Sequence, residues 1–300
     1  MLRATSIEDR RLIFDYIKKA DLRFIMLSVL FGILSHLSRA YRWKFMLAPL
    51  GYKPRFVNTI LAVLIAYVAN LGIPRSGEIL RATTLSSYEK IPFEKSFGTI
   101  IAERLVDLIF LLSFIFLALI LQYDLIWQVL KEKQISLSTI IAAAVIAVTT
   151  FICLKFLFEN NHSKTINRIK TFLKGLGEGV LSFKSMTNKG AFLLHTVFIW
   201  IMYVAMFYVI KWTVPEVENL GLSALLPAFV IGGLTISATN GGIGIYPFSV
   251  ALMLSAFGIS NESGLAFGWI VWTSQTLMII LFGSLSFFVL PLVNHKKNNL

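Results

Sequence analysis

The stretch Asn70-Leu-Gly-Ile-Pro-Arg-Ser-Gly-Glu-Ile-Leu-Arg81 places three charged residues at the end of a long apolar run. Arg75, Glu78 and Arg81 recur every three residues, and residues three apart on a helix lie on the same side. Pro74 suits the first turn of such a helix. Because a guanidinium group binds phosphate or carboxylate through two parallel hydrogen bonds, this polar strip predicts an anion-binding site.

A second group of charged residues lies near the start of the next apolar run. Glu103, Arg104 and Asp107 fall inside the run over residues 98–122. Charged side chains in a membrane-spanning segment are costly, so they face protein or a water-filled cavity. Two interpretations stay open. The two charged groups pair with each other and hold helices together, or they form a site for a lipid headgroup or an ion. Both can hold together, with some charges paired and Arg75 or Arg81 left free.

The composition places these charges in a membrane protein. Of the 300 residues, 56% are hydrophobic and 15% are charged, whereas a soluble domain carries about 25% charged residues. A soluble fold of this length cannot bury so much apolar surface. The composition therefore excludes a soluble enzyme, a disordered chain and a nucleic-acid-binding domain. The formal net charge of +12 fits Lys and Arg in cytoplasmic loops.

Nothing in the sequence indicates a cofactor. Cys153 is the single cysteine, which excludes an internal disulfide and a cysteine-based metal cluster. The four histidines lack the spacing of metal ligands, and no glycine-rich phosphate-binding motif is found. We therefore expect no cofactor, no bound metal and no nucleic acid partner.

The apolar runs predict the fold class, because a helix needs about 20 apolar residues to cross a membrane. Candidate helices lie near residues 24–38, 56–73, 98–122, 136–158, 190–212, 222–238, 246–257 and 264–290. These runs predict an all-α, polytopic transmembrane helical bundle of about six to eight crossings, formed as a single domain over residues 1–300. The last-but-one run is too short to cross alone, so together with 222–238 it predicts a re-entrant hairpin or an interrupted pair.

The distribution of Lys and Arg predicts the orientation of the chain. Segments 1–23, 74–95, 159–189 and 291–300 are predicted to face the cytoplasm, and both termini with them. Segment 1–23 includes an amphipathic helix, and 159–189 is a basic segment at the membrane surface. The loop over residues 39–55 disagrees, because it holds five basic residues yet falls on the outer side.

The stretch Ile236-Ser-Ala-Thr-Asn-Gly-Gly-Ile-Gly-Ile-Tyr-Pro247 is a second break in the apolar pattern. Its glycines do not favour the middle of a helix, and irregular backbone at membrane depth must be buried in protein or line a cavity. Free amides beside a new helix start would form an anion-binding concavity; a tight-packing turn between two helices is the alternative. Because the two breaks fall in opposite halves of the chain, they predict a transporter-like site and an inverted repeat.

At these residues the sequence resembles the transmembrane, flippase-type domain of lysylphosphatidylglycerol synthases and their stand-alone relatives. The family's Pro-x-x-Gly-Glu-x-x-Arg signature is present at residues 74–81, and Glu-Arg-x-x-Asp follows at 103–107. In the family's Pro-Gly-Gly-x-Gly turn, Asn240 replaces the proline, and Pro247 stands where a glutamate is expected. The resemblance implies movement of a phospholipid between leaflets of a bacterial inner membrane. Aminoacyl transfer belongs to a separate soluble domain, so no enzymatic activity is expected.

Together these observations predict a protein that binds an anionic phospholipid or a lipid-linked headgroup in a central polar cavity and moves it across the bilayer. The candidate site residues are Asn70, Arg75, Glu78, Arg81, Glu103, Arg104, Asp107, Asn240, Gly241, Gly242 and Gly244. The expected partners are membrane lipids; association with a second copy or with another membrane protein stays open. Two alternatives remain: a membrane-embedded transferase that uses one of the carboxylates as a base, and a scaffold subunit that transports nothing.

Overall fold

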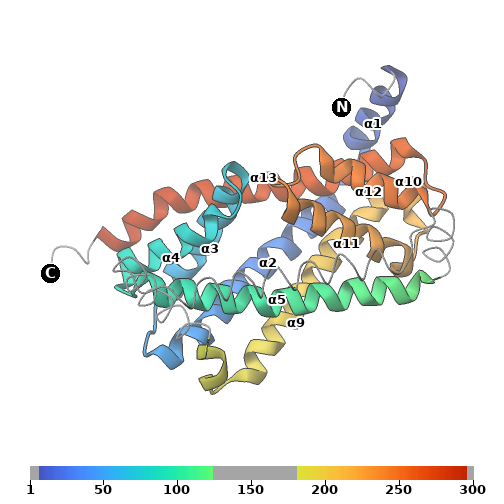
Figure 1. Cartoon of the computed structure of the whole chain (residues 1–300). Helices are drawn as coiled ribbons and strands as arrows, with labels where there is room; N and C mark the ends of the chain where they lie inside the picture. Colours follow the sequence, from blue (N-terminus) through green and yellow to red (C-terminus); the bar gives the residue numbers. More distant parts are fainter. Residues whose placement is uncertain (1–6, 124–180, 296–300) are drawn as a thin grey trace, which may run out of the picture.

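The computed structural model describes residues 7–123 and 181–295, and the regular elements in these two ranges are helices (Figure 1). In chain order they are α1 (Ile7–Lys19), α2 (Leu22–Leu47), η1 (Ala48–Leu50), α3 (Phe56–Gly72), α4 (Ser76–Glu89), α5 (Phe93–Leu121), α9 (Lys189–Tyr208), η2 (Val209–Thr213), α10 (Pro215–Glu218), α11 (Leu222–Ala238), α12 (Ile245–Ser255) and α13 (Asn261–Asn294).

In the described part of the chain, four stretches of helix are long and apolar enough to cross a membrane. They cover Leu22–Leu50, Phe93–Leu121, Lys189–Thr213 and Asn261–Asn294. Shorter apolar helices, α3, α11 and α12, lie among them. The predicted all-α membrane bundle is therefore confirmed. The predicted helix over 136–158 and most of the basic segment 159–189 lie outside the described residues.

Helix α2 corrects the prediction for the first span and the loop after it. Asp21 starts the helix by accepting a hydrogen bond from the backbone N–H of Arg23, and the helix continues to Leu47. The first span is therefore longer than the predicted 24–38. Arg39 and Arg42, assigned to an outer loop, are buried inside the bundle. The turn comes only at Gly51, which has the positive φ of 86° that glycine tolerates best.

Helices α3 and α4 form a hairpin. Ile73 precedes a proline and is extended, which ends α3, and α4 begins at Ser76. The two arms approach closely, because a Cβ on Gly77 would lie 2.0 Å from the backbone oxygen of Ala66. The segment 74–95, predicted as a cytoplasmic connection, thus contains the second arm of a packed hairpin.

Helices α11 and α12 form the second hairpin, as the run over 222–257 predicted. Its tip is the glycine-rich turn between Ala238 and Ile245, where Gly241, Gly242 and Gly244 have φ values of 64°, 74° and 73°. These angles are left-handed and favour glycine over other residues. The predicted break in the helix is therefore present.

The two hairpins enter the bundle from opposite ends, and their tips meet (Figure 1). At one end the Asn58 side chain, at the start of α3, bonds to Glu89, at the end of α4. At the opposite end Gln122 donates to the carbonyl oxygen of Ser223, at the start of α11, at 2.8 Å. Such opposed interrupted segments are typical of transporters built from inverted repeats.

The described ends of the chain lie at opposite ends of the bundle (Figure 1). Phe24 of α2 stacks on Trp212, near the start of α13, whereas Asn294 bonds to Asn58 at the other end, at 2.9 Å. Both α2 and α13 are long enough to cross a membrane. The chain therefore enters α2 at one end of the bundle and leaves α13 at the other, and the side of the membrane on which each terminus lies stays a prediction.

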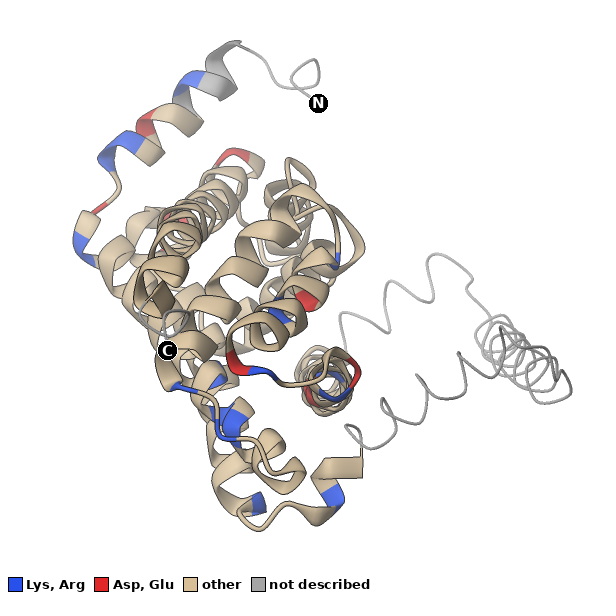
Figure 2. Ribbon diagram, turned by 90° about the vertical axis from the view of Figure 1, so that its left-hand side faces the viewer, with Lys and Arg blue, Asp and Glu red and all other residues tan. Residues whose placement is uncertain are grey.

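Figure 2 looks onto the end of the bundle at which α13 finishes, and basic residues are conspicuous there. The basic residues on helix ends and connections at this end are Lys44, Lys53, Arg55, Lys90, Lys95, Lys184 and Lys189. Helix α1, which carries both basic and acidic residues, projects from the opposite end of the bundle.

Candidate functional site

Two arginines of α2 and two carboxylates of α5 form a buried network. Arg39 contacts Glu103 and Asp107, each at 2.7 Å. Arg42 contacts the same two carboxylates, at 2.8 and 3.0 Å. None of these four side chains is more than 11% exposed. Removing one partner of such a buried pair leaves a charge without compensation and typically costs about 3–5 kcal/mol.

Arg81 brings α4 into the network. Its guanidinium donates to Glu103 at 2.9 Å and lies 3.8 Å from the ring centre of Trp43. The Trp43 indole in turn donates to Thr99 at 2.8 Å, and Arg42 donates to Thr196 of α9 at 2.8 Å. Four helices, α2, α4, α5 and α9, are therefore joined through one set of buried polar groups.

Glu78 and Arg104 form a pair at the edge of this network. Their side chains are 3.0 Å apart and are 19% and 42% exposed. Asn70 supports the pair from α3: its side-chain oxygen accepts the backbone N–H of Gly77 at 2.8 Å, and its amide nitrogen lies 3.4 Å from Glu78. The Asn70 side chain thus holds both the first turn of α4 and the carboxylate of Glu78, which lies in that turn.

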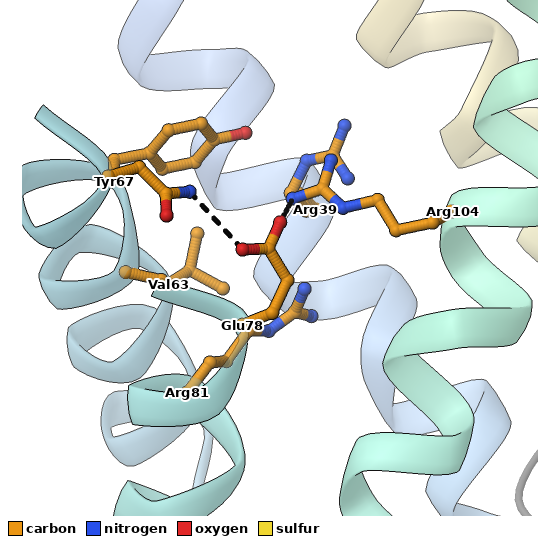
Figure 3. Close-up of a pocket in the computed structure, with 8 residues that line it drawn as sticks. Arg39, Val63, Tyr67, Glu78, Arg81 and Arg104 are labelled. Carbon is orange, nitrogen blue, oxygen red and sulfur yellow. Dashed lines mark hydrogen bonds and ion pairs between the residues drawn. The ribbon is translucent and has the colours of Figure 1, made fainter. Parts of the chain in front are cut away.

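These groups surround a small pocket (Figure 3). The cavity is about 10 Å³ in volume, room for about one water molecule. Its lining residues are Arg39, Val63, Ala66, Tyr67, Asn70, Glu78, Arg81 and Arg104. The Nε atoms of Arg39 and Arg81 are buried and make no hydrogen bond. Both arginines line the pocket, and each keeps one donor without a partner among the described residues.

Among the residues that the structure describes, the charged groups around the pocket do not balance. Four arginines, the three of the lining and Arg42, face three carboxylates, Glu78, Glu103 and Asp107. The set, which we call the arginine cluster, carries one excess positive charge. Buried charge is costly without compensation, so the cluster favours an additional anion.

Some of the predicted site residues lie together in the arginine cluster, and others lie elsewhere. Asn70, Glu78, Arg81, Glu103, Arg104 and Asp107 come together at the arginine cluster. Arg75 does not join them: it precedes α4 in a left-handed conformation, with φ of 63°, and its side chain is exposed. The helical strip predicted to run through Arg75 therefore begins only at Ser76.

The glycine-rich turn lies at the other hairpin tip and is bound to the first. The Asn240 amide donates to the carbonyl oxygen of Gly72 at 3.0 Å. Within the turn, the N–H of Gly241 donates to the Thr239 carbonyl oxygen at 3.0 Å, and the N–H of Gly242 donates to the Thr239 hydroxyl at 3.1 Å. These two amides, predicted to be free for an anion, are thus engaged inside the turn. Gly244 caps the start of α12.

Sequence reasoning missed three residues of the site, Arg39, Arg42 and Tyr67. The Tyr67 hydroxyl lies 3.0 Å from that of Tyr203, which also accepts a hydrogen bond from Arg39 at 3.3 Å. A signal for the arginines was present, because they are three residues apart and so share one side of a helix.

Comparison with known proteins agrees with this architecture. Among membrane proteins, a UPF0104 membrane protein of Methanocaldococcus jannaschii is 25% identical over 280 residues, 87% of this chain and 74% of that protein. A UPF0104 membrane protein of Pyrococcus horikoshii is 32% identical over 146 residues, 46% of this chain and 42% of that protein. No solved structure matches the chain. Residues 8–283, which include both hairpins and the arginine cluster, match the lysylphosphatidylglycerol synthase TM region, and the chain belongs to that family of membrane proteins.

Proposed function

We propose that the protein binds the anionic headgroup of a phospholipid, or of a lipid-linked molecule, at the arginine cluster and moves it between the leaflets of the membrane. The observation that carries this proposal is the excess positive charge of a cluster that is buried except at Glu78 and Arg104 and that also holds unused arginine donors. Charge inside a membrane protein usually marks a substrate or ion pathway.

The position of the cluster supports transport rather than binding alone. Asn70 and Glu78 lie beside the tip of the α3–α4 hairpin, and that tip contacts the tip of the hairpin from the opposite end. Sites between opposed, interrupted helices are reached alternately from the two sides in many transporters. A ligand bound beside the two hairpin tips would lie between the opposite ends of the bundle from which the hairpins enter.

The size of the pocket indicates a closed state. A cavity of about 10 Å³ holds about one water molecule and no headgroup. Binding therefore requires the α3–α4 hairpin to move relative to α5. The partly exposed Glu78–Arg104 contact is the element of the cluster that such a movement separates most easily, because surface ion pairs contribute only about 0–1 kcal/mol.

The test is lipid movement in proteoliposomes that contain a fluorescent anionic phospholipid, with dithionite added to quench the outer leaflet. We expect the wild-type protein to expose inner-leaflet lipid to the quencher and Arg104→Gln to slow this exchange at least fivefold. Lys53→Gln is the matched control, because it removes one positive charge from an exposed loop. Equal exchange by both variants, at equal incorporation, would contradict the proposed site.

The scaffold alternative makes a different prediction for the same variants. If the arginine cluster only holds helices together, Arg104→Gln changes thermal stability and leaves the exchange rate of the folded protein unaltered. Measuring both quantities on one preparation separates the two functions.

A further inference from the structure

The three carboxylates of the arginine cluster are held very differently. Glu103 is fully buried and accepts hydrogen bonds from Arg39, Arg42 and Arg81. Asp107 is 11% exposed and accepts from Arg39 and Arg42. These two carboxylates are fixed by several buried partners each, so they belong to the permanent structure.

Glu78 is bound much more weakly. It contacts one arginine, Arg104, and that arginine is the most exposed of the cluster, at 42%. Its other oxygen faces the Asn70 amide at the long distance of 3.4 Å. Figure 3 shows the Glu78 carboxylate directed into the pocket, between Arg104 and the other lining residues.

We propose that the Glu78 carboxylate acts as an internal substitute for the ligand's anionic group, and that a phosphate-type oxyanion displaces it from Arg104 when it binds. This inference rests on the proposed function, because the oxyanion is the charged part of the transported headgroup. It adds that the empty site is closed by an acidic residue of the protein itself.

The surroundings of Glu78 allow the exchange. After leaving Arg104, the carboxylate keeps the Asn70 amide as a neighbour. It also lies in the first turn of α4, where the helix dipole stabilises a negative charge. Displacement therefore does not leave Glu78 without favourable contacts.

The arginines determine the class of ligand. The guanidinium of Arg104 offers a planar pair of donors that matches two oxygens of one phosphate group. Arg39 and Arg81 line the same pocket, and among the described residues their buried Nε atoms have no hydrogen-bond partner. A phosphodiester with one negative charge would neutralise the excess charge of the cluster, and a free phosphate shares this chemistry.

The experiment measures binding to the purified full-length protein in detergent, with dihexanoyl phosphatidylglycerol and inorganic phosphate as separate probes. Glu78→Gln removes the competing charge, and we expect it to bind the lipid about five times more tightly, since a partly exposed ion pair no longer has to be broken. Glu78→Asp keeps the negative charge, so its affinity for the lipid should stay close to that of the wild-type protein. Glu218→Gln, at an exposed position in α10, is the charge-matched control.

The outcomes separate this inference from the proposed function. Wild-type binding that depends on Arg104 but is equal in Glu78→Gln would overturn the displacement and leave the lipid function intact. Tighter binding of inorganic phosphate alone by Glu78→Gln would support the displacement and contradict a lipid as the ligand. No binding of either probe by any folded variant, as judged by gel filtration and thermal unfolding, would overturn both.

Discussion

The side chain of Asn240 donates a hydrogen bond to the backbone oxygen of Gly72 at 3.0 Å, and this contact joins two hairpins that enter the bundle from opposite ends. The residues are 168 positions apart. Trp272 of α13 fixes the same turn by donating to the Gly241 carbonyl oxygen at 2.8 Å. The tips are thus held against each other by one hydrogen bond and against α13 by another.

Asn240→Ala should weaken the contact between the hairpin tips. A single hydrogen bond typically contributes about 0.5–1.5 kcal/mol, so we expect a small decrease in the thermal unfolding temperature of the detergent-solubilised protein. If tip contact maintains the closed state, lipid exchange by the variant will be faster than by wild type. Asn219→Ala, at an exposed position after α10, serves as the control; equal exchange by both variants would show that this hydrogen bond does not restrain the tips.

Gly77→Ala should prevent the α3–α4 hairpin from packing as it does now. The added Cβ would lie 2.0 Å from the backbone oxygen of Ala66, and a backbone atom cannot move aside as a side-chain end can. Overpacking of this kind costs about 1–3 kcal/mol or more. Gly190→Ala is the matched control in α9, because nothing lies within 4 Å of its added Cβ. A Gly77→Ala protein as thermally stable as the control would show that the arms pack less closely.

Glu103→Gln should be the most destabilising of the single substitutions in the arginine cluster. It removes the negative charge that three buried arginines share and replaces one acceptor oxygen by a donor, and such a loss costs about 3–5 kcal/mol. We expect a low yield of monodisperse protein and a much lower unfolding temperature. Glu94→Gln, in the first turn of α5, tests a carboxylate outside the cluster. Similar stability of the two variants would contradict the assignment of Glu103 to the permanent structure.

The sequence predicted five of the seven charged residues of this cluster and missed the other two for a physical reason. The five predicted residues are recognisable because they interrupt apolar runs at helical spacing; they are Glu78, Arg81, Glu103, Arg104 and Asp107. Arg39 and Arg42 also lie at helical spacing, but their charge suggested the end of a span. The carboxylates that compensate them are 61–68 positions away in the chain, so no local pattern indicates that these arginines are buried.

Of the two hairpins, the sequence predicted the α11–α12 hairpin but not the α3–α4 hairpin. The glycines between α11 and α12 predicted a break because few other residues tolerate their positive φ values. The short α4 has few apolar residues and was assigned to a cytoplasmic connection. The packing of α4 in the bundle depends on Gly77, which lies against α3, and on the ion pair from Arg81 to α5. Both contacts join segments that are apart in the sequence, so no local pattern predicts them.

The pH dependence of stability should include a contribution from Glu216, which lies outside the membrane-spanning helices. Its carboxylate accepts the backbone N–H of Ser260 at 2.9 Å, and this hydrogen bond lowers the pKa of Glu216 below its ordinary value of 4.5. A lowered pKa in the folded state stabilises the protein above the unfolded pKa, and the stabilisation is lost as the pH falls through the folded value. Unfolding temperatures measured from pH 6 downward should therefore fall less steeply below pH 4.5 in Glu216→Gln than in wild type.

The positions of the helix ends predict that the two termini lie on opposite sides of the membrane. The end of the bundle at which α13 finishes carries Lys and Arg on several helix ends and connections (Figure 2). Basic residues in short loops mark the cytoplasmic side, so we expect the C-terminus inside and the N-terminus outside. Fluorescent-protein and alkaline phosphatase fusions at each terminus test this, because the first is active inside and the second outside. Two termini on the same side would show that either α2 or α13 does not cross the membrane, and the parallel arrangement of these helices would then need another explanation.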